Sequence, residues 1–159
     1  MFKLYHLIIY LSFAIGLLLL ILPLPDGIRI YRPDWLALII IYWSMALPKY
    51  VGLWTALIIG LFVDSLLGTL LGQHALALVV ITYLNLNLHL RIRVLSLVQQ
   101  SVYVFGLLLI NQTIIFWIDG ITGLTIPVQA LFGAPLIGAL LWPCVFIILR
   151  DIRRKAMFN

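Results

Sequence analysis

Residues 4–22 read LYHLIIYLSFAIGLLLLIL, an apolar run without a single Asp, Glu, Lys or Arg. A helix needs on the order of 20 apolar residues to cross the hydrocarbon core of a bilayer. The run exceeds the roughly 7–15 residues of a secretory signal h-region. It also lacks an A-x-A cleavage pattern, and further apolar runs follow it. We therefore expect a membrane anchor that is retained.

The composition of the whole chain indicates that lipid is its solvent. Of the 159 residues, 65% are hydrophobic and only 9% are charged, whereas about a quarter of the residues in soluble domains are charged. A soluble fold of this length leaves about a third of its chain's surface in water, and so few polar residues cannot cover it. The net charge of +5 comes from basic residues in the gaps between apolar runs, which is a topology signal rather than a nucleic-acid-binding face.

The apolar runs predict an all-α integral membrane protein, a bundle of about six transmembrane helices that forms a single domain over residues 1–159. The second run counts only 13 residues before Pro48. At ~1.5 Å per residue it is shorter than the ~30 Å hydrocarbon core. We expect this helix either to be lengthened by its flanking residues or to be surrounded by neighbouring helices. The helices are expected at residues 4–22, 35–47, 51–67, 74–90, 95–118 and 129–149.

The distribution of basic residues predicts the orientation, because Lys and Arg accumulate on the cytoplasmic side of a membrane protein. With six crossings, the outer segments hold only Arg29 and Arg32. This pattern predicts a multi-pass protein of the inner (cytoplasmic) membrane with both ends in the cytoplasm. The segments on the side of the N-terminus hold eight basic residues: Lys3, Lys49, Arg91, Arg93, Arg150, Arg153, Arg154 and Lys155.

Asp64 is the ionisable side chain placed firmly inside an apolar run. Small residues recur around it every fourth position, at Gly60, Gly68 and Gly72, and this spacing puts Gly60 and Asp64 on one helix face. A carboxylate inside a membrane is costly and usually faces the protein interior. Three roles stay open: a polar clamp on the following turn, a site for a ligand or a proton, and a contact with a partner protein.

Other polar side chains lie within the runs. Asn111 and Gln112 are in the middle of the fifth run, where interhelical hydrogen bonds are worth on the order of 1 kcal/mol. We interpret them as packing contacts, with a polar lining for a cavity shared with Asp64 as the alternative. Asn85 and His89, four residues apart near the inner end of the fourth run, are predicted to lie at the membrane interface.

The outer segment before the second run carries a possible docking site. Arg29 and Arg32 lie between Asp26 and Asp34, and Trp35 follows directly. In one interpretation the charges pair locally within the loop; in the other they form, together with Trp35, a docking point for another protein in the periplasm. Both interpretations stay open.

The sequence contains no pattern typical of an enzyme or of a cofactor site. It has no glycine-rich phosphate loop, no His/Cys/Asp cluster with metal spacing and no nucleophile beside a base. One buried carboxylate is not an acid–base pair. We therefore predict a protein that is not an enzyme and that holds neither a metal nor a cofactor.

Several short motifs, in order along nearly the whole chain, together resemble the MreD family. This family is the small membrane component of the bacterial rod-shape (elongation) machinery. The motifs are Leu22-Pro23-Leu24-Pro25-Asp26 followed by Arg32-Pro33-Asp34-Trp35; Tyr42-Trp43 with Ala46-Leu47-Pro48; Gly60-x-x-x-Asp64-x-x-x-Gly68-x-x-x-Gly72 with Ala75-Leu76 and Tyr83; and Leu141-Trp142-Pro143 with the basic tail.

The resemblance implies a non-catalytic membrane scaffold of the elongation complex. Such a scaffold binds MreC and helps couple the actin-like MreB filament to the peptidoglycan synthases, which are RodA and its class B transpeptidase. The expected surroundings are these proteins and the lipids of the bacterial inner membrane.

The family is also similar in architecture to the substrate-binding S subunits of energy-coupling-factor transporters. That similarity implies a rival function, the binding of a small ligand or lipid in a pocket near Asp64. Those subunits dock their partner through an alanine pair four residues apart on the first helix, whereas this chain has Ser12-x-x-x-Gly16 there.

Overall fold

A computed structural model of the chain describes residues 2–29 and 31–158, apart from the side chains of Phe2, Asp26 and Arg29. The described residues form helices and no strand, which confirms the all-α prediction, and six of these helices have 12 or more residues. The elements are α1 (Phe2–Ile21), α2 (Asp26–Arg29), α3 (Trp35–Ala46), α4 (Leu53–Leu67), α5 (Gln73–Ile92), α6 (Leu97–Ile121) and α7 (Val128–Phe158).

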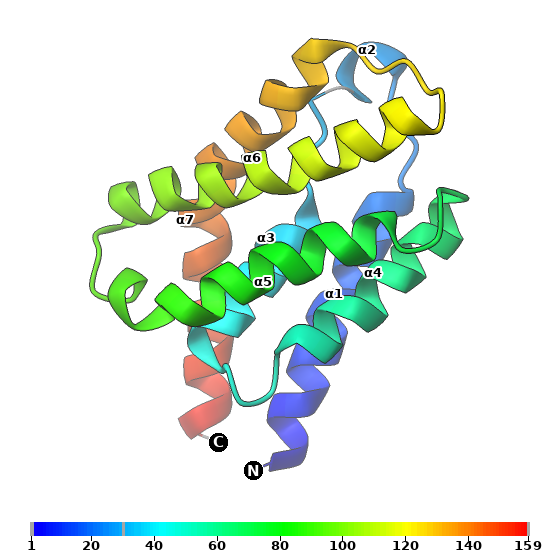
Figure 1. The fold of residues 1–159 in the computed structure, drawn as a ribbon. Coiled ribbons are helices and arrows are strands. Elements are labelled where there is room, and N and C mark those ends of the chain that lie inside the picture. The colour runs from blue at the N-terminus through cyan, green and yellow to red at the C-terminus, as the bar shows by residue number, and fades with distance from the viewer. Residues whose placement is uncertain (1, 30, 159) are drawn as a thin grey trace.

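The helices pack mainly against their neighbours in the sequence, with α3 as the common centre. Helix α4 packs on α5, α5 on α6 and α6 on α7, while α3 contacts α1, α5 and α7. Figure 1 shows the start of α1 and the end of α7 at the same end of the bundle, and α2 and the α6–α7 loop at the opposite end.

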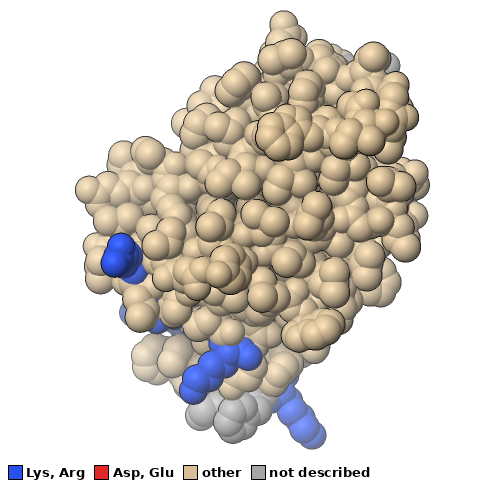
Figure 2. Space-filling view, viewed as in Figure 1, with Lys and Arg blue, Asp and Glu red and all other residues tan. Residues whose placement is uncertain are grey.

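The outer surface of the bundle is that of a membrane protein. Four helices are long and apolar enough to cross a membrane: Lys3–Ile21 within α1, and α5, α6 and α7. Only 22–39% of their most apolar stretches is buried inside the bundle, so the remaining side chains need an apolar solvent. Figure 2 shows Lys and Arg gathered toward the end that carries both termini, with no other charge on that face.

Helix α3 is short because the protein itself surrounds it. Its ten residues Leu36–Met45 are all buried, and a helix that is apolar on every side is one that lies in a core. At ~1.5 Å per residue its 12 residues span only about 18 Å. Irregular backbone beyond its ends is tolerated at membrane depth where protein encloses it. The structure therefore shows shelter by neighbouring helices.

Two helices continue beyond the predicted boundaries. Helix α6 ends at Ile121 rather than at residue 118, and α7 continues to Phe158 rather than stopping at residue 149. The basic tail stays helical because one face of it still packs on the bundle, where Ala156 is buried. Arg153 also lies over the ring of Tyr42 at 5.9 Å. A prediction based on hydropathy stops at the first charges and does not detect this face.

Candidate functional site

Asp64 lies near the end of α4 and accepts hydrogen bonds from the turn that leads into α5. Its Oδ1 accepts from Thr69 Oγ1 at 2.9 Å, from His74 N at 2.9 Å and from His74 Nδ1 at 2.8 Å. Its Oδ2 accepts from Gly72 N at 2.8 Å and from Ala75 N at 3.5 Å. The carboxylate is 1% exposed, so these donors replace the water that an ionised group would otherwise need.

The glycines around Asp64 give this turn its shape. Gly68 ends α4 with φ +69° and Gly72 precedes α5 with φ +100°, and both values lie in the left-handed region that favours glycine. Gly60 allows α4 and α5 to cross closely, because a Cβ there would lie 2.2 Å from Ala75 Cα. The four-residue pattern thus combines one close crossing, one buried carboxylate and two turn positions.

A cavity of about 200 Å³ lies beside this turn, between α1, α4, α5, α6, α7 and the segment that precedes α3. Its polar lining comes from Arg32, Asp34, His74 and Gln112. Asp64 does not line the cavity, but it holds the imidazole of His74 that does. Gln112 and His74, which bonds Asp64, therefore line the same cavity.

Asn111, one residue before Gln112, contacts a different carboxylate from Asp64. Its Nδ2 donates to Asp34 Oδ2 at 2.9 Å, while its own buried Oδ1 has no hydrogen-bond partner among the described residues. Asp34 is the N-cap of α3, and its Oδ1 accepts from Ala37 N at 3.1 Å. An anion at this end of a helix is favoured by the helix dipole. Asp34, one of the candidate docking residues, thus makes hydrogen bonds inside the protein.

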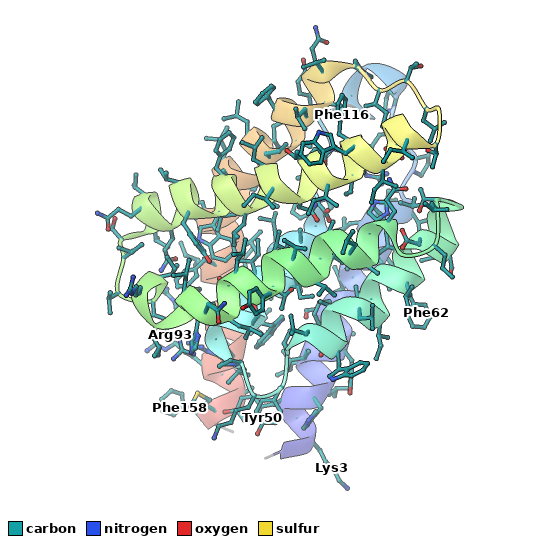
Figure 3. The ribbon with its side chains drawn as sticks, viewed as in Figure 1. Lys3, Tyr50, Phe62, Arg93, Phe116 and Phe158 are labelled. Atoms are coloured by element: carbon teal, nitrogen blue, oxygen red, sulfur yellow. The ribbon has the colours of Figure 1, made fainter. Side chains whose placement is uncertain are left out.

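The other end of α3 is capped by a cation. Arg93, at the junction of α5 and α6 (Figure 3), donates from Nε to Met45 O at 2.8 Å and from Nη2 to Ala46 O at 3.0 Å. Its Nη2 also bonds Met45 O. These are C-terminal carbonyls of α3 that the helix itself leaves without a partner. The sequence interpretation counted Arg93 only as a topology signal and missed this role.

We expect Arg93→Gln to lower the free energy of unfolding by about 2 kcal/mol, because charged hydrogen bonds to the end of α3 are lost. The measurement is SDS-induced unfolding of the full chain in mixed micelles. Arg91→Gln is the matched control, since it removes the same charge from an exposed residue near the end of α5, two positions before Arg93. Equal stability of the two variants would contradict a capping role.

A second buried polar network joins α3, α5 and α6. Asn85 Nδ2 donates to Ile41 O at 2.8 Å and to Ser44 Oγ at 2.6 Å, and its Oδ1 accepts from Tyr103 OH at 3.1 Å. Asn85 is 0% exposed, so the prediction that it lies at the membrane interface is wrong. Its amide has enough partners in the core to be buried at little cost.

The start of α5 and the end of α6, close to the cavity, are also joined by a polar pair. Gln73 Nε2 donates to Asp119 Oδ1 at 2.7 Å, and both side chains are buried. This pair explains why α6 continues past its predicted end at residue 118. The helix continues to Ile121 because the carboxylate points into the protein and finds a donor.

The predicted docking residues are also used within the fold. Arg32 Nη2 donates to Leu19 O and Leu22 O, each at 2.6 Å, where a cation complements the C-terminal end of α1. Trp35 is half-buried and packs against the hydrophobic core. The side chain of Arg29 lies outside the described part of the chain. Of the same outer segment, Ile28 is 56% exposed and Tyr31 is 44% exposed.

The hydrogen bonds of Asp64 join α4 to α5, and the polar lining of the adjacent cavity is suited to binding a small polar group. An ionised carboxylate only accepts, so Nδ1 of His74 carries the hydrogen toward Asp64. The residues lining the cavity beside His74 include no Ser, Thr, Cys or Tyr that could act as a nucleophile. Within the described ranges, no group of three or more His, Cys, Asp or Glu side chains could hold a metal ion.

Comparison with known proteins gives a consistent family. The family described as "rod shape-determining protein MreD" matches residues 1–152 of the chain. A rod shape-determining protein MreD from Haemophilus influenzae is 37% identical over 148 residues, which cover 92% of this chain and 91% of the relative. No solved structure matches the chain, so the similarity to transporter S subunits stays a prediction. The chain belongs to the MreD family of rod shape-determining proteins.

Proposed function

We propose that this protein is a non-catalytic scaffold of the cell-elongation complex in the bacterial inner membrane. In this role it binds MreC and helps couple the MreB cytoskeleton to RodA and its class B transpeptidase. The observation that carries the proposal is the family match over residues 1–152 of the chain.

The chemistry of the interior supports a scaffold. Polar side chains that an enzyme would direct at a substrate are instead bonded to the protein: Asp64 to the α4–α5 turn and Asp34 to Asn111. Exposed side chains on the long helices are mostly large and apolar. Such faces suit lipid and the transmembrane helices of other proteins, between which van der Waals packing drives association.

An orientation with both termini in the cytoplasm fits this role. The end that carries both termini is the basic one (Figure 2), and basic ends of membrane proteins remain in the cytoplasm. Helix α2 and the α6–α7 loop then face the periplasm. A partner outside the membrane and a filament inside it would thus meet opposite ends of one bundle.

The scaffold is tested by co-purification of the tagged full chain with MreC, RodA and the class B transpeptidase from detergent. We expect MreC to be recovered with the chain. The exposed side chains of the outer segment are the proposed contact, so Ile28→Ser combined with Tyr31→Ser should lower the recovery of MreC about tenfold or more.

The matched control is Leu124→Ser, which changes an exposed apolar residue in the α6–α7 loop at the same end of the bundle. It should leave the recovery of MreC unchanged. Recovery of the chain alone, while MreC and the synthases remain associated with each other, would argue against the scaffold.

The second candidate function is the binding of a small ligand or lipid near Asp64, in the manner of a transporter S subunit. The cavity of about 200 Å³ lined by Arg32, Asp34, His74 and Gln112 favours it. We would identify small molecules released from the purified protein by mass spectrometry. Gln112→Leu should abolish a specific ligand and Gln129→Leu, an exposed glutamine on α7, should retain it. A wild-type protein that releases no such molecule contradicts this function.

A further inference from the structure

A second polar cavity lies at the end of the bundle that carries both termini. It has a volume of about 280 Å³, close to the lower end of the ~300–1,000 Å³ range of ligand sites. The end of α3, the α5–α6 junction and the basic part of α7 enclose it. Its polar and aromatic lining consists of Tyr42, Arg93, Gln100, Phe146 and Arg153.

Two buried polar groups in this lining have no partner within the described part of the chain. The hydroxyl of Tyr42, a residue that is 1% exposed, makes no hydrogen bond, and neither does Nε of Arg153. Leaving such groups without a partner costs free energy, and each case in a native protein needs an explanation. Both groups can donate a hydrogen bond, so an acceptor is what the cavity lacks.

The other polar groups of the cavity are already engaged. Gln100 Nε2 donates to Ile92 O at 3.1 Å, and its Oε1 accepts from Trp142 Nε1 at 3.3 Å. Arg93 bonds the carbonyls at the end of α3 but keeps its positive charge. These residues hold the walls in position and leave Tyr42 and Arg153 as the donors available to a ligand.

The electrostatic environment favours an anion. Arg93 and Arg153 line the cavity, and no Asp or Glu is among the residues that line it. The nearby Asp151 has a 52% exposed side chain and lies 3.4 Å from Arg150 Nε. Two positive charges and no carboxylate in the lining make the cavity favourable for a negatively charged group.

We propose that this cavity binds a phosphate group, with Tyr42 and Arg153 as its hydrogen-bond donors and Arg93 as a second positive charge. Arginine matches the geometry of phosphate, and basic pockets between transmembrane helices bind anionic lipid headgroups. The phosphate is either the diester in the headgroup of an anionic phospholipid or the monoester of a soluble molecule. The inference depends on the protein being embedded in a membrane and not on the scaffold function.

The test uses the purified full chain, stripped of lipid in dodecyl maltoside. Three probes are titrated and followed by native mass spectrometry: phosphatidylglycerol, phosphatidylcholine and glycerol 3-phosphate. We expect saturable binding of phosphatidylglycerol, weakened about tenfold by Arg153→Gln and by Tyr42→Phe. Arg154→Gln, an exposed neighbour with the same loss of charge, should change the affinity less than twofold.

Tyr42→Phe separates a ligand-binding role from a structural one. It removes only a hydroxyl that bonds none of the residues that the structure describes, so the lipid-free melting temperature should stay the same or rise while the affinity falls. Binding of glycerol 3-phosphate with the same dependence on these residues supports the site and identifies a soluble source. The proposal is overturned if no probe saturates, if phosphatidylcholine binds equally, or if Arg154→Gln weakens binding as much as Arg153→Gln.

Discussion

Replacing Asp64 with asparagine is expected to lower the free energy of unfolding by about 3 kcal/mol. Each carboxylate oxygen accepts a backbone N–H, Oδ1 from His74 and Oδ2 from Gly72. Whichever way the amide is turned, its NH₂ group faces one of these donors and leaves a buried N–H without an acceptor. The measurement is SDS-induced unfolding of the full chain in mixed micelles.

Asp151→Asn is the control for this prediction, because it removes the same charge from an exposed side chain. It should change stability by less than about 0.5 kcal/mol. An Asp64→Asn variant as stable as the wild type would show that the turn does not need both oxygens. Loss of rod shape in the Asp64→Asn strain is therefore informative about ligand binding only if the variant remains folded.

Gly60→Ala is the second substitution with a large expected effect, a loss of about 3 kcal/mol, at the upper end of overpacking costs. The added Cβ would lie 2.2 Å from Ala75 Cα and 2.6 Å from Ala75 N. Both are backbone atoms, so no side-chain rotation can relieve the clash and α4 must move away from α5. That movement also strains the bonds from the α5 end of the turn to Asp64, one helical turn further along.

Gly106→Ala on α6 is the matched control, because a Cβ there meets no atom within 4 Å. Alanine is a better helix former than glycine by about 1 kcal/mol, so this variant should be as stable as the wild type or more so. The close crossing is contradicted if the two alanine variants unfold at the same SDS concentration.

The helical membrane fold could be predicted from the sequence because the composition of each helix indicates whether lipid or protein surrounds it. Residues 4–22 are apolar without interruption, and no packing information is needed to assign them to lipid. The residues at which the helices end were harder to predict. Asp119 and the basic tail have the polarity of loops, and only their partners, Gln73 for Asp119 and the bundle surface for the tail, keep them helical.

The candidate site could be found in part. Asp64 is conspicuous in sequence because a carboxylate in an apolar run is rare, and its spacing from Gly60 indicated the helix face that packs closely. The donors to Asp64 were not predictable, because they depend on how the turn folds back over residues 69–75.

The contacts that sequence reasoning missed join distant parts of the chain. Arg93 bonds Met45 across 48 positions and Asn111 bonds Asp34 across 77. Arg93 resembles any basic residue at a membrane interface. A signal was nevertheless present, since an unusually short apolar helix must have its ends satisfied by something inside the protein.

A bundle in the bilayer with both chain ends in the cytoplasm underlies every function proposed for this protein. Cysteine labelling in spheroplasts tests it most directly, in a Cys144→Ser background with either Leu124→Cys or Met157→Cys. We predict that a membrane-impermeant maleimide modifies Leu124→Cys in intact spheroplasts and modifies Met157→Cys only after lysis. Modification of Met157→Cys in intact spheroplasts would contradict the orientation with both chain ends in the cytoplasm.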